Sequence, residues 1–283
     1  MSMRRAGMLF TLALFAFISA CSFKTVYNRL DYLIPEYVEG VVTLDHALEQ
    51  RLDERTVLLL QWHRNTQLKQ YADWLQSLQQ DVNGQLTTGR MEQHVARMEQ
   101  FWLALVIMLN DEMAYLLPLL DAEQREDLFA YLDETNEEFR EEFIDRDDGE
   151  RSEDYAERMI DTYENWIGDL SDSQTLTVEQ GASRLISTAE HRLARRLEWQ
   201  QGIRDILAGS DSRYDKSQRL RAFLAGFEHD PDGPIKQASD FNRKIIIGLT
   251  VEIANSMTQD QKGHFTSNTD DYVRMFTELA ENR

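Results

Sequence analysis

Apolar residues recur at alternating steps of three and four positions along two long stretches of the chain. The first series is Leu68, Tyr71, Leu75, Leu78 and Val82, and the second is Met91, Val95, Met98, Trp102, Leu105 and Leu109. This spacing places the side chains on one face of an α-helix, where a partner helix buries them. Because Asn83-Gly84 interrupts the pattern, the sequence predicts an antiparallel helical hairpin with coiled-coil-like seams.

The rest of the chain also favours helices. It contains only four prolines and thirteen glycines in 283 residues, and no Val/Ile-rich alternating stretch indicates a sheet. We expect an all-α protein folded as an elongated antiparallel helical bundle. The expected helices are 43–82, a helix from Met91 that Pro118 ends, 122–144, 152–167, 178–208, 216–227, 235–255 and 259–280. Residues 43–283 should form one helical domain, and two subdomains meeting near residues 148–152 remain an alternative.

The first twenty residues have the layout of an export signal. Arg4 and Arg5 precede an apolar run from Ala6 to Ile18, and no acidic residue occurs before Asp31. The run is shorter than the roughly 20 residues that a membrane-spanning helix needs, but it has the length of a signal-peptide core. The sequence therefore predicts that residues 1–20 are a cleaved signal peptide.

The end of this signal resembles the lipobox of bacterial lipoproteins. By that resemblance Ile18, Ser19 and Ala20 are the signal peptidase recognition residues, and Cys21 carries the lipid. The alternatives are an ordinary secretory signal with a chance cysteine, and a twin-arginine signal, whose flanking pattern Arg4-Arg5 lacks. Several acyl chains on Cys21 would hold the protein firmly at a membrane. Ser22, by enterobacterial sorting rules, favours the outer membrane over the inner membrane.

Two consequences follow for the mature chain. Cys21 is the only cysteine, so no disulfide and no cysteine-based metal site is expected. Residues 21–42 are expected to form a lipidated tether, with a short amphipathic piece from Val26 to Leu33 that Pro35 ends.

The charge of the chain is strongly acidic and unevenly distributed. The net charge is −20, residues 121–164 hold 19 acidic and 5 basic side chains, and residues 184–221 hold 9 basic and 5 acidic ones. The negative electrostatic potential of so acidic a chain repels phosphate groups and disfavours nucleic-acid binding. Two interpretations of the acidic segment remain open. Either the basic residues of the later segment lie across from it (Arg192, Arg195, Arg196 and Arg204), or its acidic face is exposed to solvent or to a basic partner.

Four short segments share the pattern of a helix-capping box, in which a short polar residue is followed three positions later by glutamine. The pairs are Asp121 with Gln124, Ser171 with Gln174, Thr177 with Gln180, and Thr258 with Gln261. Two of these segments are crowded between Leu170 and Gln180, which leaves open which one starts the helix there.

Enzyme and metal signatures are absent from the sequence. The histidines show no zinc-ligand spacing, and the Asp145–Gly149 segment lacks the glycine position and final glutamate of an EF-hand, although loose calcium binding stays open. Trp62-His63-Arg64 is the most conspicuous cluster. A hydrogen-bonded histidine that locks a helix pair explains it better than a catalytic role. We therefore expect no enzyme activity, no cofactor and no metal.

Several of these motifs together resemble an uncharacterised family of proteobacterial lipoproteins. They are Cys21–Lys24 followed by Val26–Asp31, the Trp62-His63-Arg64 cluster with Leu68, Tyr71, Ala72 and Leu75 after it, the capping boxes, and Tyr163 with Trp166. A looser similarity is to periplasmic stress proteins of the Spy and CpxP type, which are helical cradles with L-T-x-x-Q repeats.

The resemblance implies a helical lipoprotein and no reaction. We expect a lipid-anchored protein that faces the periplasm and acts through protein interaction, as an adaptor or a chaperone-like cradle for unfolded clients in envelope maintenance or stress response. A structural spacer without a client is the first alternative, and an enzyme of unknown chemistry is the second.

Overall fold

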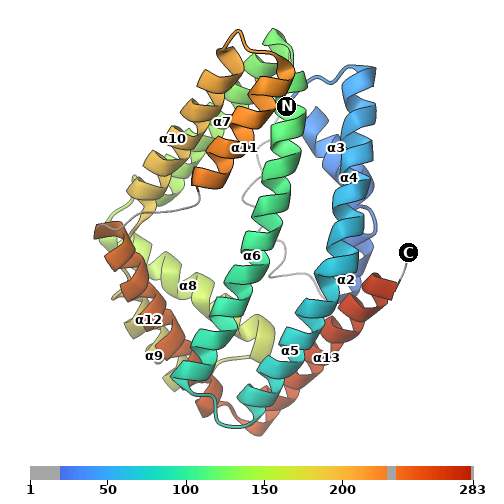
Figure 1. Ribbon diagram of the computed structural model, residues 1–283. Coiled ribbons are helices and arrows are strands. Elements are labelled where there is room, and N and C mark those ends of the chain that lie inside the picture. The colour runs from blue at the N-terminus through green and yellow to red at the C-terminus, as the bar shows by residue number, and fades with distance from the viewer. Residues whose placement is uncertain (1–19, 228–233, 282–283) are drawn as a thin grey trace, which may run out of the picture.

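The computed structural model describes residues 20–227 and 234–281, and all regular structure in these two ranges is helical (Figure 1). The prediction of an all-α protein is confirmed. Residues 1–19 of the expected signal peptide, including Ile18 and Ser19, lie outside the described residues, as do the side chains of Ala20, Cys21 and Ser22. The helices are α2 (Ala20–Tyr27), α3 (Leu30–Glu39), α4 (His46–Thr66), α5 (Leu68–Asn83), α6 (Thr88–Leu116), the 3₁₀ turn η1 (Leu117–Leu119), α7 (Ala122–Phe143), α8 (Asp148–Ile167), α9 (Asp172–Ala182), α10 (Ala189–Ala208), α11 (Arg213–Phe227), α12 (Pro234–Ser256) and α13 (Gln259–Glu281).

The long helix α6 runs between two groups of helices (Figure 1). An apolar core lies near each of its ends. Near its start, Met91 packs on a core built from α5, α8, α9, α12 and α13, in which Val178 and Ile253 are buried. Near its end, Met113 packs on a second core, built with α7, α10 and α11 around Leu207 and Leu220. The chain passes from the second core to the first through the connection between α7 and α8. This connection lies next to residues 148–152, where the sequence suggested a subdomain boundary.

The apolar face of α5 is covered by α13 and much less by α6. Leu68 at the start of α5 packs with Leu279 near the end of α13, whereas Asn83 at the end of α5 donates to Thr266 near the start of α13, so the two helices are antiparallel. The predicted seam on α5 is therefore present, but its predicted partner was wrong. Periodicity shows that a face is buried and does not identify the helix that buries it.

Two predicted helices are each divided in two. The predicted 43–82 helix is interrupted at Gln67, between α4 and α5, although backbone hydrogen bonds continue on both sides of that residue. The predicted 178–208 helix is interrupted by residues 183–188. There the side chain of Asn242, from α12, accepts from the N–H of Ile186 and donates to its carbonyl. This distant side chain satisfies the backbone that a continuous helix would otherwise have paired.

The expected tether at residues 21–42 is also corrected, because it is helical and packed. Tyr27 and Val42 are buried, and Pro35 lies inside α3 instead of ending a helix. The proline lacks a backbone N–H to donate, but α3 packs along α4 and the proline ring is buried there. Burial of the ring offsets the lost hydrogen bond.

Candidate interaction surface

The helix α6 exposes several large apolar side chains. Only four of its 29 residues are buried: His94, Phe101, Glu112 and Ala114. The seam expected from the sequence is contradicted at three of its positions, because Met98, Trp102 and Leu109 are 36–57% exposed. The partner that would bury them as a hairpin, α5, packs on α13 instead.

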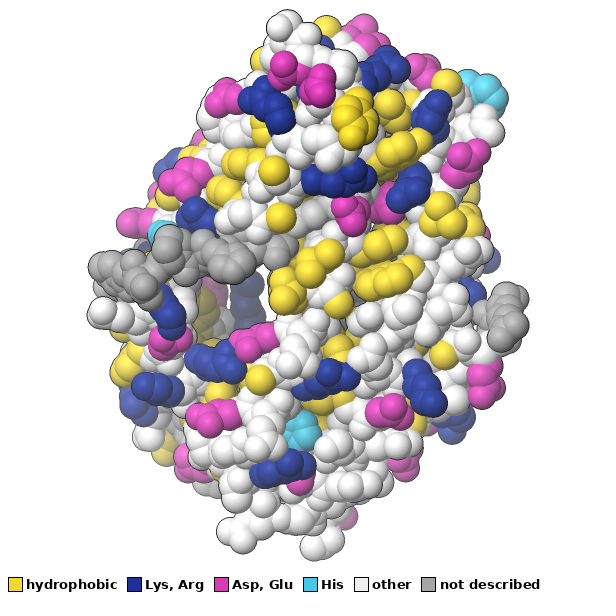
Figure 2. All heavy atoms as spheres, viewed as in Figure 1, with side chains coloured by type: hydrophobic (Ala, Val, Ile, Leu, Met, Phe, Trp, Pro, Cys, Tyr) yellow, Lys and Arg dark blue, Asp and Glu magenta, His cyan; other side chains and the backbone are white. Residues whose placement is uncertain are grey.

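Apolar residues are exposed on a second face of α6 as well. Leu103 and Ile107, four positions apart, are about half exposed, and they do not share the face of Met98 and Trp102. Figure 2 shows hydrophobic side chains gathered over the middle of α6 and on the side of it that faces α4. We call Met98, Trp102, Leu103 and Ile107 the α6 surface.

The same helix is the one described segment that is long and apolar enough to cross a membrane. Residues Thr88–Leu119 contain an 18-residue window that is apolar enough, yet only 17% of that window is buried. Core helices of soluble proteins pass this test of composition, but they are mostly buried. An apolar helix that stays exposed in the fold is typical of an interaction surface.

The Trp62-His63-Arg64 cluster lies where α2 meets α4 and α5. The Nδ1 atom of His63 is 2.8 Å from the Tyr27 hydroxyl, and its Nε2 atom is 3.3 Å from the Tyr71 hydroxyl. The guanidinium of Arg64 lies over the Tyr27 ring, 5.3 Å from its centre. Both ring nitrogens of His63 are thus engaged by tyrosines, so the arrangement ties three helices together and leaves neither nitrogen directed at a substrate.

Burial lowers the pKa of His63 from 6.5 to about 4. The unfolded chain therefore binds a proton between these two pH values that the folded chain does not, and stability is lost as the pH falls from about 6.5 to about 4. Allowing for the partial exposure of the ring, we expect a loss on the order of 2 kcal/mol. Urea unfolding at several pH values should show this loss in the native protein. His63→Gln should remove that part of the pH dependence, and an identical pH profile for the variant would contradict the assignment.

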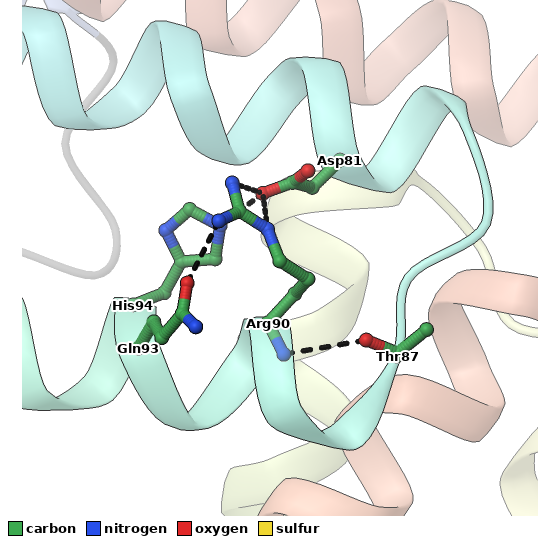
Figure 3. A network of polar contacts seen from close by, with 5 residues as sticks. All are labelled: Asp81, Thr87, Arg90, Gln93 and His94. Carbon is green, nitrogen blue, oxygen red and sulfur yellow. Dashed lines mark hydrogen bonds and ion pairs between the residues drawn. The ribbon is translucent and has the colours of Figure 1, made fainter.

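A second polar network, which the sequence analysis missed, closes the turn between α5 and α6 (Figure 3). Asp81 accepts hydrogen bonds from Arg90 Nη2 and from His94 Nε2, each at 2.7 Å. The hydrogen bond from Arg90 is the main cause that lowers the pKa of Asp81. Arg90 also donates to Gln93, and its backbone N–H donates to Thr87 at the start of α6. The only sequence signal for this network is the four-residue spacing of Arg90 and His94.

The capping boxes do more than start helices. At Asp121 with Gln124, Ser171 with Gln174 and Thr258 with Gln261, both reciprocal hydrogen bonds are present. Gln174 and Gln261 also bond to each other, which joins the starts of α9 and α13. Thr177 and Gln180 do not form a box. They lie inside α9, where the Thr177 hydroxyl donates to the Ser173 carbonyl, so Ser171 starts this helix.

The arginines of α10 lie against the acidic helix α7, as one of the two interpretations expected. Arg204 pairs with Asp133 at 2.7 Å, and Arg196 donates to the Thr135 hydroxyl. Arg192 also lies over the ring of Phe139, and Arg204 lies over the ring of Phe129.

Arg195 does not contact α7 in this way. It donates to the Phe227 carbonyl of α11. The packing therefore uses ring faces and hydroxyls more than carboxylates, and several acidic side chains of α7 remain exposed: Asp133, Glu134, Glu137 and Glu141.

Asp147 has a structural role at the start of α8. The Asp147 carboxylate accepts from the Glu150 N–H and so caps the helix. Within residues 20–227 and 234–281, no group of three or more His, Cys, Asp or Glu side chains is placed to hold a metal ion.

Comparison with known proteins gives a family and no activity. No curated protein and no solved structure is significantly similar to this chain. Residues 41–229, about two thirds of the chain, match the model of a family described as a family of unknown function, DUF6279. This range includes α4 to α11, and therefore the α6 surface and the His63 cluster. The chain belongs to the DUF6279 family of unknown function.

Proposed function

We propose that this protein is anchored by lipid on Cys21 at the periplasmic face of the outer membrane, and that it acts as a chaperone-like cradle for apolar segments of unfolded envelope proteins. The observation that carries the proposal is the α6 surface, where the four apolar side chains stay about half exposed between two well-packed cores. Large apolar side chains exposed on two faces of one helix cost solubility unless a partner uses them.

The surroundings of the α6 surface fit such a client. The two cores hold the ends of α6, so its middle is presented on a rigid frame. The net charge of −20 keeps the protein soluble despite the exposed apolar residues and favours clients that are not acidic. The resemblance to an export signal and a lipobox supports a location in the periplasm. Unfolded envelope proteins pass through this compartment after export.

Aggregation of an unfolded, reduced client tests the proposal. The native protein should slow the light-scattering increase at a near-equimolar ratio. Trp102→Gln combined with Ile107→Gln should reduce this effect severalfold, because both substitutions remove apolar contact area from the α6 surface. The substituted side chains are exposed, so thermal unfolding should change little.

Leu176→Gln on α9 is the matched control, since Leu176 is also about half exposed but belongs to another helix. It should protect the client as well as the native protein does. The proposal would be contradicted if the double variant and Leu176→Gln lost protection of the client equally, or if the native protein gave no protection. A structural spacer would then be the better interpretation. Mass spectrometry of protein purified from membranes tests the anchor separately, because a chain without acyl mass on Cys21 contradicts it.

A further inference from the structure

The helix α2 connects the residue proposed to carry the lipid directly to the folded body. Cys21 is the second residue of α2, which is helical from Ala20 to Tyr27. A helix rises about 1.5 Å per residue, so Cys21 and Tyr27 are about 9 Å apart along its axis. Tyr27 is 4% exposed, and its hydroxyl is 2.8 Å from Nδ1 of His63. The chain from Cys21 to Tyr27 is therefore a helix with a buried end and provides no flexible spacer.

This helix is also held at its start, because it lies beside the end of α13 (Figure 1). The rings of Phe23 and Phe276 meet edge to face, with their centres 6.0 Å apart. The Nζ atom of Lys24 donates to the Glu278 carboxylate at 2.5 Å. Both contacts are made within three positions of Cys21. The position of Cys21 relative to α13 is thus fixed by packing.

Further ring contacts join this end of the molecule to α5 and α6. The ring of Phe276 lies against that of Tyr71 on α5, with their centres 5.7 Å apart. The ring of Tyr71 in turn lies 4.8 Å from that of Phe101 on α6. Close-packed side chains move together, so α2, α5, α6 and α13 are parts of one rigid frame. Whatever holds Cys21 therefore also sets the orientation of the body.

The charge of this region differs from that of the whole chain. We call residues 20–30 together with residues 274–281, the last two turns of α13, the anchored end. It holds three basic side chains, Lys24, Arg29 and Arg274, and two acidic ones, Glu278 and Glu281. The chain as a whole has a net charge of −20. Anionic headgroups would repel most of so acidic a surface, but they would not repel the anchored end.

From these observations we propose that the anchored end lies directly on the phospholipid headgroups, so that the body rests on the membrane instead of hanging from it on a tether. The proposal rests on the lipid anchor proposed above. Several acyl chains hold Cys21 firmly at the headgroup layer, and the packed α2 then brings the end of α13 to the same layer. The α6 surface is thereby held at a fixed height above the membrane.

Energy transfer to a dye on lipid headgroups tests this contact. The mature acylated protein is placed in vesicles of phosphatidylethanolamine and phosphatidylglycerol with acceptor-labelled headgroups, and a donor dye is attached to one added cysteine. Thr277→Cys places the donor at the anchored end, and Ser239→Cys places it at the start of α12, across the molecule from α2 (Figure 1). Both positions are exposed. Transfer should be severalfold more efficient from residue 277 than from residue 239.

A flexible spacer provides the matched variant. About 20 Gly and Ser residues inserted after Ser22 have ends on the order of 25 Å apart, so the body can leave the membrane. Transfer from residue 277 should fall severalfold, with circular dichroism unchanged. Equal transfer from residues 277 and 239, or no effect of the spacer, overturns the membrane contact. The acyl mass of each sample is measured as well, because its absence contradicts the anchor itself, whereas equal transfer from acylated protein contradicts only the contact.

Discussion

Replacing Arg55 by alanine should lower the free energy of unfolding by about 3–5 kcal/mol, as expected when one partner of a buried ion pair is removed. The Glu112 side chain is 8% exposed and accepts both hydrogen bonds from Arg55, whose own side chain is 30% exposed. Without Arg55 the Glu112 carboxylate stays buried and loses the guanidinium that pairs with it. Urea unfolding at neutral pH measures the effect.

Two further variants separate the lost pair from other effects of the substitution. Arg55→Met combined with Glu112→Leu should recover most of the stability, because no charge is left buried and the replacements keep the volume. Arg274→Ala removes an exposed partner of Asp271 and should cost at most about 0.5 kcal/mol. If the double variant were as unstable as Arg55→Ala, the loss would come from packing of the arginine stem and not from the unpaired carboxylate.

The positions of the helices could largely be predicted from the sequence, because apolar periodicity and capping are local. The series from Leu68 to Val82 placed α5, and Asp121 with Gln124 placed the start of α7. The interruption at residues 183–188 could not be predicted, since the Asn242 side chain that stabilises it is more than fifty positions away in the chain.

The sites were harder to predict, because they depend on which helices meet. The sequence drew attention to His63 but not to Tyr27 and Tyr71, the hydroxyls that engage it. Nothing in the series from Met91 to Leu109 distinguishes a buried seam from an exposed one. That difference depends on α13, which takes the place on α5 that a hairpin would give to α6.

The contact between α5 and α13 extends beyond the region that defines the family. The family match ends at residue 229, but the helix that covers the apolar face of α5 is α13, residues 259–281. Leu68 and Leu279 are both fully buried in this contact. The core at the start of α6 also takes Ile253 and Phe265 from beyond the match.

A fragment limited to residues 41–229 should therefore fail to unfold cooperatively, although it spans the whole family match. It would expose the α13-facing side of α5 and half of one core, a loss far larger than the roughly 5–15 kcal/mol by which most domains are stable. We expect it to keep much of its helical circular dichroism, to bind a hydrophobic dye and to lack a sharp thermal transition. The full chain is the control, and co-expression of residues 230–283 should restore the transition. A fragment that melted as sharply as the full chain would show that the core built from α7, α10, α11 and the end of α6 suffices. In that case α13 would only cover a surface that is stable without it.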